Sequence, residues 1–397
     1  MHASKRLSYI GVSPTMKVSA KAKKMKAEGL EVIDLSVGEP DFPTPGNIKD
    51  AAKRAIDNNK TKYTVNVGLP ELREAIANKL KRDNGLDYSI SEIVVSSGAK
   101  QSLFNTILSM IYVGDELIIP APYWVSYPHM VSIAQGETVT ISTEEKNGFK
   151  VTPEQLESSI SPFTKGILIC NPSNPTGSAY SKKELEELVE VLENKEIYII
   201  ADEIYEKLVY DDYKFVSIAS FSEKIKRKTI VINGVSKAYS MTGWRIGFTA
   251  GPEEIISGIN KIQSHSTSNA SSISQYAAIE AFNGPQDAVE KMRIEFQERR
   301  NYIHNAITSI PNISCYKPNG AFYLFPNISN YFGKTYGKYK INNSVDLAMY
   351  LLENAEVAVV PGSAFGSEGF IRISFATSIQ NLEKAFERIK KALEQLS

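Results

Sequence analysis

Short runs of β-branched residues alternate with amphipathic segments between about residue 46 and residue 290. Such alternation predicts a mostly parallel sheet covered by helices on both faces, because crossovers between parallel strands are usually helical. Seven runs have the length and composition of buried strands: 93–96, 116–120, 137–141, 166–170, 197–201, 229–233 and 246–250. We therefore expect an α/β fold whose large domain contains a mostly parallel, seven-stranded sheet.

Helix signals fill the gaps between these strands. Pro70 falls in the first turn of one helical pattern, and Ser181 precedes Glu184 by three residues, as in a capping box. A long helical pattern from about 287 to 313 leaves the sheet region, and the rest of the chain is typical of a separate α+β lobe.

The domain organisation follows from this change of pattern. We predict a large domain at 46–290 and a smaller α+β domain formed by the N-terminal arm, 1–45, together with the C-terminal lobe, 291–397. The stretch 330–343, rich in Tyr, Gly and Lys, indicates an exposed loop.

Composition removes several functional classes. The chain of 397 residues has 45 basic and 45 acidic side chains, so no net field favours nucleic acid or an anionic membrane. Its two cysteines form no CxxC motif and its four histidines do not cluster, so neither a disulfide framework nor a metal site is predicted. No signal-peptide pattern opens the sequence, and its apolar runs are far shorter than the roughly 20 residues that span a bilayer. We expect a cytoplasmic protein.

Ligands of open α/β sheets bind beyond the carboxyl ends of the strands, and chemically active residues occupy those positions here. Asp202 follows the strand 197–201, with Tyr205 three residues later. A carboxylate at this place can keep a pyridine nitrogen protonated, although a helix N-cap is the simpler interpretation of Asp202 alone.

Lys237 lies beyond the end of the strand 229–233, at the same sheet edge. Schiff-base chemistry needs a lysine whose pKa is lowered in a dry site, but taken alone Lys237 is better explained as a solvated surface lysine. Ser236 beside it and Arg245 eight residues later supply a hydroxyl and a guanidinium suited to a phosphate. The three residues together favour a phosphate-bearing ligand.

Two loops after strands add to this pattern. The small residues of 96–102 lead into a helix whose first N–H groups can hold an anion, unless the turn serves only tight packing. The stretch 170–177 contains two Asn-Pro pairs, and its rigid path would aim the Asn174 amide; the Asn174–Pro175 bond is a candidate for the cis form.

Trp124 and Arg372 complete the candidate set. Trp124 follows a strand and could stack on a flat ring, although most aromatic side chains belong to the core. Arg372 stands inside an apolar strand, where a guanidinium needs an anion. Either a substrate carboxylate or a structural ion pair would satisfy it.

Taken in order, these motifs resemble the class I aminotransferases of fold type I, which depend on pyridoxal 5′-phosphate (PLP). The resemblance runs from about Ser13 to the C-terminus and includes the following segments: 37–42, 62–63, 97–100, 122–124, 171–177, 202–205, 236–237, 243–247 and Arg372.

The resemblance implies cofactor roles. Lys237 would hold PLP as a Schiff base and move the proton between the substrate α-carbon and the cofactor. Asp202 would pair with the pyridine nitrogen, Tyr205 and Asn174 would bind the phenolate oxygen, and Trp124 would stack on the ring. The phosphate would be bound by these residues: Gly98, Ala99, Lys100, Ser236, Arg245 and, from the other subunit of a homodimer, Tyr63.

The resemblance also implies a substrate. Arg372 and Asn174 would bind the α-carboxylate, with the backbone of Gly38 and the ring of Trp124 beside it. The chain looks closest to the bacterial gamma-type aspartate aminotransferases, in which a lysine, here Lys100, and a hydroxyl of the N-terminal arm, here from Ser13 or Thr15, bind the second carboxylate. The stretch 264–272 lacks the Arg that animal and enterobacterial enzymes bring from the partner subunit.

We therefore expect ping-pong transamination of aspartate with 2-oxoglutarate. Use of prephenate is left open, because both substrates are dicarboxylates. The alternatives are an aromatic, kynurenine or alanine-type aminotransferase, a PLP lyase or decarboxylase, and a PLP-binding regulator. The regulator would need a fused DNA-binding domain, and fewer than about 50 residues precede the sheet region.

Overall fold

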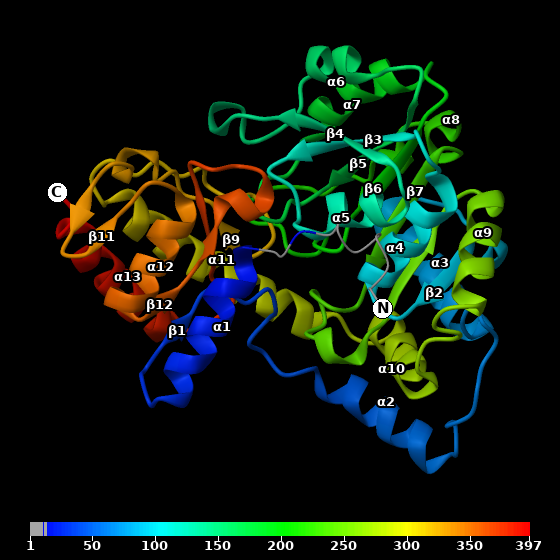
Figure 1. Ribbon diagram of the computed structural model, residues 1–397. Coiled ribbons are helices and arrows are strands. Elements are labelled where there is room, and N and C mark those ends of the chain that lie inside the picture. The colour runs from blue at the N-terminus through cyan, green and yellow to red at the C-terminus, as the bar shows by residue number, and fades with distance from the viewer. Residues whose placement is uncertain (1–10, 12–13) are drawn as a thin grey trace, which may run out of the picture.

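A seven-stranded sheet forms the centre of the computed structural model, which describes residue 11 and residues 14–397, with side chains described at residue 11 and from residue 18 (Figure 1). The strand order is β2-β8-β7-β6-β5-β3-β4. Only β8 runs antiparallel to its neighbours, and the other adjacent pairs are parallel. The strands are β2 (Ile93–Ser96), β3 (Glu116–Ala121), β4 (Glu137–Ser142), β5 (Thr164–Cys170), β6 (Tyr198–Asp202), β7 (Thr229–Gly234) and β8 (Gly247–Ala250). The predicted fold class is confirmed.

Burial on both faces explains why the sequence revealed these strands. In β3, Ile118 packs on one face of the sheet, whereas Leu117 and Ile119 pack on the other. Each buried isoleucine or leucine contributes about 1.5–3 kcal/mol relative to an exposed one, so a one-residue shift of register would be costly. Apolar residues at successive positions therefore fix both the strand and its place in the sheet.

Helices cover both faces, as predicted. One face carries α4 (Ala99–Met110), α5 (Ser126–Ile133) and α9 (Glu253–Ser264). The other face carries α2 (Gly46–Asp57), α3 (Pro70–Asn84), α6 (Pro153–Ser159), α7 (Lys182–Leu192), α8 (Glu223–Lys226) and α10 (Ser272–Asn283). The predicted capping box of α7 is present: the Ser181 hydroxyl accepts from the Glu184 N–H, and the Glu184 carboxylate accepts from the Ser181 N–H.

The N-terminal and C-terminal segments share a second core. Strand β1 (Ile33–Asp34) pairs in parallel with β12 (Val357–Ala358), so the blue start of the chain lies against its orange and red end (Figure 1). A three-stranded antiparallel sheet stands beside this pair: β13 (Val360–Pro361), β14 (Ile371–Ser374) and β9 (Tyr323–Leu324). The helices of this region are α1 (Pro14–Ala27), α11 (Asp287–Thr308), α12 (Ser344–Ala355) and α13 (Ile379–Glu394). Because α11 runs unbroken through residue 290, the predicted domain boundary there falls inside a helix. The domain limits stay a prediction.

The expected loop at 330–343 contains a short hairpin, so that expectation was incomplete. Strands β10 (Thr335–Tyr336) and β11 (Tyr339–Lys340) pair in antiparallel register. The Tyr339 hydroxyl donates to Glu353 at 2.7 Å, and its ring packs edge-on against Tyr350. These long-range contacts hold a segment whose local composition is typical of a loop.

Within the described residues, no helix is long and apolar enough to cross a membrane.

Candidate active site

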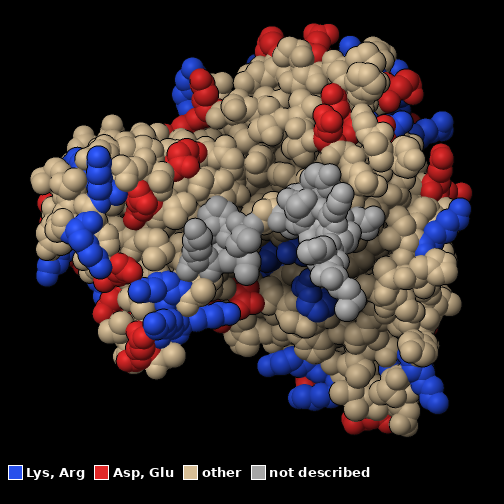
Figure 2. Space-filling view, viewed as in Figure 1, with Lys and Arg blue, Asp and Glu red and all other residues tan. Residues whose placement is uncertain are grey.

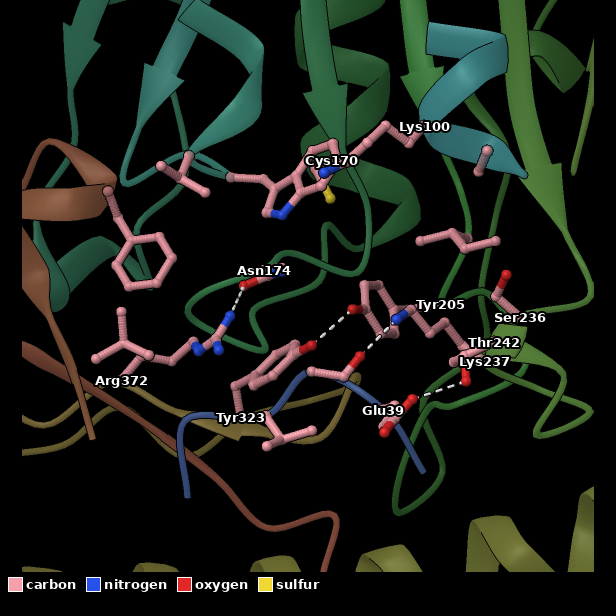
Figure 3. A pocket seen from close by; sticks show the side chains of 18 of the residues that line it. Glu39, Lys100, Cys170, Asn174, Tyr205, Ser236, Lys237, Thr242, Tyr323 and Arg372 are labelled. Carbon is pink, nitrogen blue, oxygen red and sulfur yellow. Dashed lines mark hydrogen bonds between the residues drawn. The ribbon is translucent and has the colours of Figure 1, made fainter. Parts of the chain in front are cut away.

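A cavity of about 470 Å³ lies at the carboxyl ends of the central strands, where the sheet meets the C-terminal lobe. Most of the candidate residues line it: Gly38, Ala99, Lys100, Trp124, Asn174, Asp202, Tyr205, Ser236, Lys237, Arg245 and Arg372. Figure 3 shows Lys237 and Arg372 on opposite sides of this cavity, with Tyr205 and Tyr323 between them. Residues that lie more than 300 positions apart in the sequence thus meet in one site.

Lys237 follows β7 and extends its amine into the cavity. Its Nζ donates to the carbonyl oxygen of Gly38 at 2.6 Å. Burial, together with the positive charges of Arg372 and Arg245, lowers the pKa of Lys237 to about 8, while the acidic side chains of Glu39 and Asp202 oppose this shift. An amine with such a pKa exists partly in the neutral, nucleophilic form near physiological pH.

Asp202 is the last residue of β6 and is 4% exposed. Its Oδ2 accepts a hydrogen bond of 2.6 Å from the Tyr127 hydroxyl, and its Oδ1 accepts a longer one of 3.3 Å from the Ile204 N–H. Burial raises the pKa of the Asp202 carboxyl, while these hydrogen bonds and the charge of Lys237 oppose that rise. A buried carboxylate is therefore held beside a cationic amine in the same cavity.

Arg372 projects from β14 on the opposite side. Its Nη1 donates to Asn174 Oδ1 at 3.0 Å and its Nη2 donates to the carbonyl oxygen of Ser36 at 2.6 Å. The guanidinium lies 4.4 Å from the centre of the Tyr323 ring. Its Nε is buried and has no hydrogen-bond partner among the described residues. No carboxylate of the described chain pairs with Arg372, so the structure leaves a buried cation available to an anionic ligand.

Two phenol groups join the two sides of the cavity. The hydroxyls of Tyr205 and Tyr323 lie 2.8 Å apart, and both side chains are fully buried. Burial raises the pKa of each phenol, so both remain protonated near neutral pH. One hydroxyl donates to the other, and the second proton remains available for another acceptor.

The start of α4 forms a third wall with Arg245. Gly98 is the N-cap, with a φ of +88°, and a Cβ at this position would lie 2.3 Å from Arg245 Nη2. Only glycine tolerates both the backbone conformation and this close approach. Arg245 itself has a φ of +54° and donates to the Thr242 carbonyl at 2.9 Å, which keeps its guanidinium by the helix start. Free N–H groups, the helix dipole and a guanidinium make this wall suited to a phosphate.

Lys100 lies over the ring of Trp124, with 4.8 Å between its Nζ and the ring centre. Burial lowers the pKa of Lys100, and the charge of Arg245 lowers it further. Trp124 in turn packs edge-on against Tyr127, with 5.3 Å between ring centres. The aromatic wall of the cavity thus has a cation at its rim.

Two candidate residues that the structure describes, Gly98 and Tyr63, are not among the residues that line the cavity. Tyr63 is 93% exposed and does not line it. Ser13 lies outside the described residues, and Thr15 belongs to α1 but its side chain is also outside them.

The cis peptide bond expected between Asn174 and Pro175 is present. The Asn171–Pro172 and Ala121–Pro122 bonds are also cis.

Sequence reasoning missed Tyr127 and Tyr323 as site residues. Tyr127 lies one helical turn after Trp124, so the spacing of the two residues was a usable signal for a shared direction. Tyr323 lies in an apolar run that gives no sign of a polar role.

Away from the cavity, Figure 2 shows acidic and basic side chains interspersed on the visible face. Among the described residues on this face there is no extended basic surface of the kind that nucleic acid requires.

The fold and this cavity define an aminotransferase of class I and II. The model of the family described as "Aminotransferase class I and II" matches residues 31–389, and the chain belongs to this family. The resemblance drawn from the sequence motifs is thereby confirmed.

Individual relatives agree over the whole chain. The aspartate aminotransferase of Geobacillus stearothermophilus is 49% identical over 394 residues, which cover 99% of each chain. The probable aspartate/prephenate aminotransferase of Rickettsia conorii is 48% identical over 393 residues, or 98% of each chain. The crystal structure of the aspartate aminotransferase from Rhizobium meliloti superposes with a TM-score of 0.97 at 46% identity and covers 100% of both chains.

Proposed function

We propose that this protein is a PLP-dependent aminotransferase that transfers the amino group of aspartate to 2-oxoglutarate in two half-reactions. The observation that carries the proposal is one cavity that contains a lysine of lowered pKa, a buried carboxylate and a buried guanidinium that pairs with no carboxylate among the described residues. The names of the Geobacillus and Rhizobium relatives support aspartate as the substrate.

The cavity fits PLP at each functional group. Asp202 would keep the pyridine nitrogen protonated, and Tyr205 together with the Asn174 amide nitrogen would donate to the phenolate oxygen. The N–H groups at the start of α4, the Ser236 hydroxyl and Arg245 would bind the phosphate, where the missing Cβ of Gly98 leaves room. When bound, PLP supplies an electron sink for the electron pair left on the substrate α-carbon after deprotonation.

Lys237 would both hold the cofactor and transfer the substrate proton. Its lowered pKa, about 8, would allow the amine to accept a proton from the substrate α-carbon and to donate one again at moderate pH. Tyr205 and Phe322 each place a ring centre 5.9 Å from Nζ, so the amine works against a largely apolar wall. This wall limits access of water to the proton-transfer step.

Arg372 would bind the substrate α-carboxylate. Its contacts with Asn174 and with the Ser36 carbonyl fix the guanidinium plane, so little side-chain entropy remains to be lost when a carboxylate binds. The backbone at Gly38 lies beside the same region. For the second carboxylate we propose Lys100, with a hydroxyl from Ser13 or Thr15.

A homodimer belongs to the same proposal. Tyr63 is 93% exposed in the single chain, so its ring and hydroxyl are accessible to a second subunit. We propose that it reaches the phosphate in the partner subunit, and that the protein works in the cytoplasm.

A substrate panel tests the proposal. The purified protein is mixed with aspartate, glutamate, tyrosine or alanine, and loss of the aldehyde-form absorbance of PLP is followed in each case. Prephenate, an oxo acid without an amino group, is added instead to protein already converted to the aminated form, and return of the aldehyde-form absorbance is followed. We expect rapid conversion with aspartate and glutamate. Prephenate is a second candidate because the Rickettsia relative bears that name. Fast conversion with tyrosine or alanine but not aspartate would favour the aromatic or alanine-type alternative, and no conversion at all would contradict aminotransferase activity.

A further inference from the structure

We propose that Tyr127 is a positioning residue for the cofactor: its hydroxyl keeps the Asp202 carboxylate charged and fixes the direction in which it meets the pyridine nitrogen. This inference rests on the proposed function, because it concerns the use of Asp202 toward PLP.

The geometry makes Tyr127 the main partner of Asp202. The distance of 2.6 Å between the hydroxyl and Oδ2 is that of a charge-assisted hydrogen bond, whereas the Ile204 N–H is 3.3 Å from Oδ1. Both side chains are buried, at 1% exposure for Tyr127 and 4% for Asp202. Oδ2 is thus engaged, and Oδ1, which accepts only the longer hydrogen bond, can accept from a further donor.

The direction of the hydrogen bond follows from burial. The pKa of the Tyr127 phenol is raised well above 10, because burial and the nearby charge of Asp202 both oppose its ionisation. The phenol therefore remains protonated and donates, and the carboxylate accepts. A donated hydrogen bond stabilises the charged carboxylate, and this opposes the effect of burial on Asp202.

Surrounding groups do not replace this donor. Cys170 is the register neighbour of Asp202 on β5 and lies near the Tyr127 hydroxyl, but burial raises the pKa of its thiol to about 12 and a thiol is a weak donor. Burial and the charge of Glu206 raise the pKa of Glu203, the next residue, to about 8, and its carboxyl contacts the Ser217 hydroxyl rather than Asp202. The positive charge of Lys237 favours a charged Asp202. In the PLP-bound enzyme, however, the Lys237 amine would be bonded to the cofactor.

Tyr127 also links two walls of the cavity. It lies in the first turn of α5, its N–H donates to the Trp124 carbonyl at 3.0 Å, and the two rings pack edge to face. Trp124 is the proposed stacking residue, so one short segment would set both the plane of the cofactor ring and the partner of its nitrogen.

The test measures PLP affinity rather than turnover. PLP is titrated into the apoprotein, and quenching of tryptophan fluorescence gives the dissociation constant for wild type, Tyr127→Phe, Asp202→Asn and the double variant. Tyr127→Phe removes one oxygen and keeps the ring against Trp124. We expect it to weaken PLP binding by about tenfold or more, the usual effect of a hydrogen bond to a charged group. In the Asp202→Asn background the same change should have little further effect, because no charge remains to be stabilised.

Tyr180→Phe is the matched control. Tyr180 is buried, and its hydroxyl accepts from the Val151 N–H at 3.0 Å without contacting Asp202. Its loss should leave PLP affinity unchanged.

The outcomes separate the two proposals. If wild type binds no PLP, the proposed function fails and this inference fails with it. If wild type binds PLP but Tyr127→Phe binds equally well, or is weakened equally in both backgrounds, only the role of Tyr127 is overturned. Should Tyr127→Phe not fold, 3-fluorotyrosine at position 127, a stronger donor, must tighten PLP binding; unchanged or weaker binding would overturn the role.

Discussion

The ε-amino group of Lys237 lies 2.6 Å from the carbonyl oxygen of Gly38, and the two residues are 199 positions apart. The hydrogen bond joins the end of β7 to the segment that follows β1. It holds the amine in the cavity. The same residue therefore connects the sheet to the N-terminal segment and provides the reactive amine.

Replacing Lys237 should separate binding from catalysis. We expect Lys237→Ala to lose transamination by at least about 10²- to 10⁴-fold, the range of a missing general acid-base group. The variant should still bind PLP, but dialysis should remove the cofactor, because Asp202 and the phosphate wall remain while the covalent attachment is lost. Absorbance before and after dialysis checks this. Lys165→Ala, at the opposite end of β5, is the control and should retain both properties.

The pH dependence of apoprotein stability tests the lowered pKa of Lys237. Between the folded value, about 8, and the ordinary value of 10.5, the unfolded chain binds the proton and the folded chain does not. The free energy of unfolding should therefore rise with pH in this window, and below it both states are protonated. Relative to Lys237→Met, wild type should gain up to about 3 kcal/mol across the window in urea titrations. A difference that stays constant with pH would contradict the lowered pKa.

Gly98→Ala should weaken PLP binding through Arg245. The added Cβ would lie 2.3 Å from Nη2 and displace the guanidinium from the helix start. We expect affinity for PLP to fall by about tenfold, the value of one charge-assisted hydrogen bond. Gly85→Ala is the matched control, because its φ of +68° is also left-handed but nothing lies within 4 Å of a Cβ there. That variant should lose about 1 kcal/mol of stability and keep its PLP affinity.

Lys100→Ala tests the choice of a dicarboxylate. If Lys100 binds the second carboxylate, kcat/KM for aspartate should fall by about ten- to a hundredfold, whereas that for alanine should change little. Steady-state kinetics with both substrates checks this. An equal loss with the two substrates would assign Lys100 to the cofactor alone, and no loss with either would remove it from the site.

The sequence was most informative where local signals and burial agree. All seven sheet strands were predicted to within two residues. In the central strands apolar runs are buried on both faces, whereas the edge strand β4, which is largely exposed, was marked by its alternating Thr, Val and Ile residues. Lys237, Asp202 and Asn174 were predicted because each lies at or just beyond the carboxyl end of such a strand.

Long-range pairing limited the rest of the prediction. Strands β1, β9, β12 and β13 have two residues each and exist only through their partners, so no periodicity marks them. The hairpin at 335–340 depends on α12 in the same way. Tyr323 is hidden in an apolar run, and its role follows only from its contact with Tyr205 and its position below Arg372.

The hydrogen bond between Arg372 and Ser36 joins two residues that are synthesised far apart in time. The part of the site proposed to bind the cofactor is therefore made earlier than the part proposed to bind the substrate. Ser36 leaves the ribosome 336 residues before its partner, and at about 5–20 residues per second that interval lasts roughly 20–70 s. The groups proposed to hold PLP, from Gly98 to Arg245, are all made well before Arg372. A nascent chain can thus complete its cofactor wall while it is still unable to recognise a substrate.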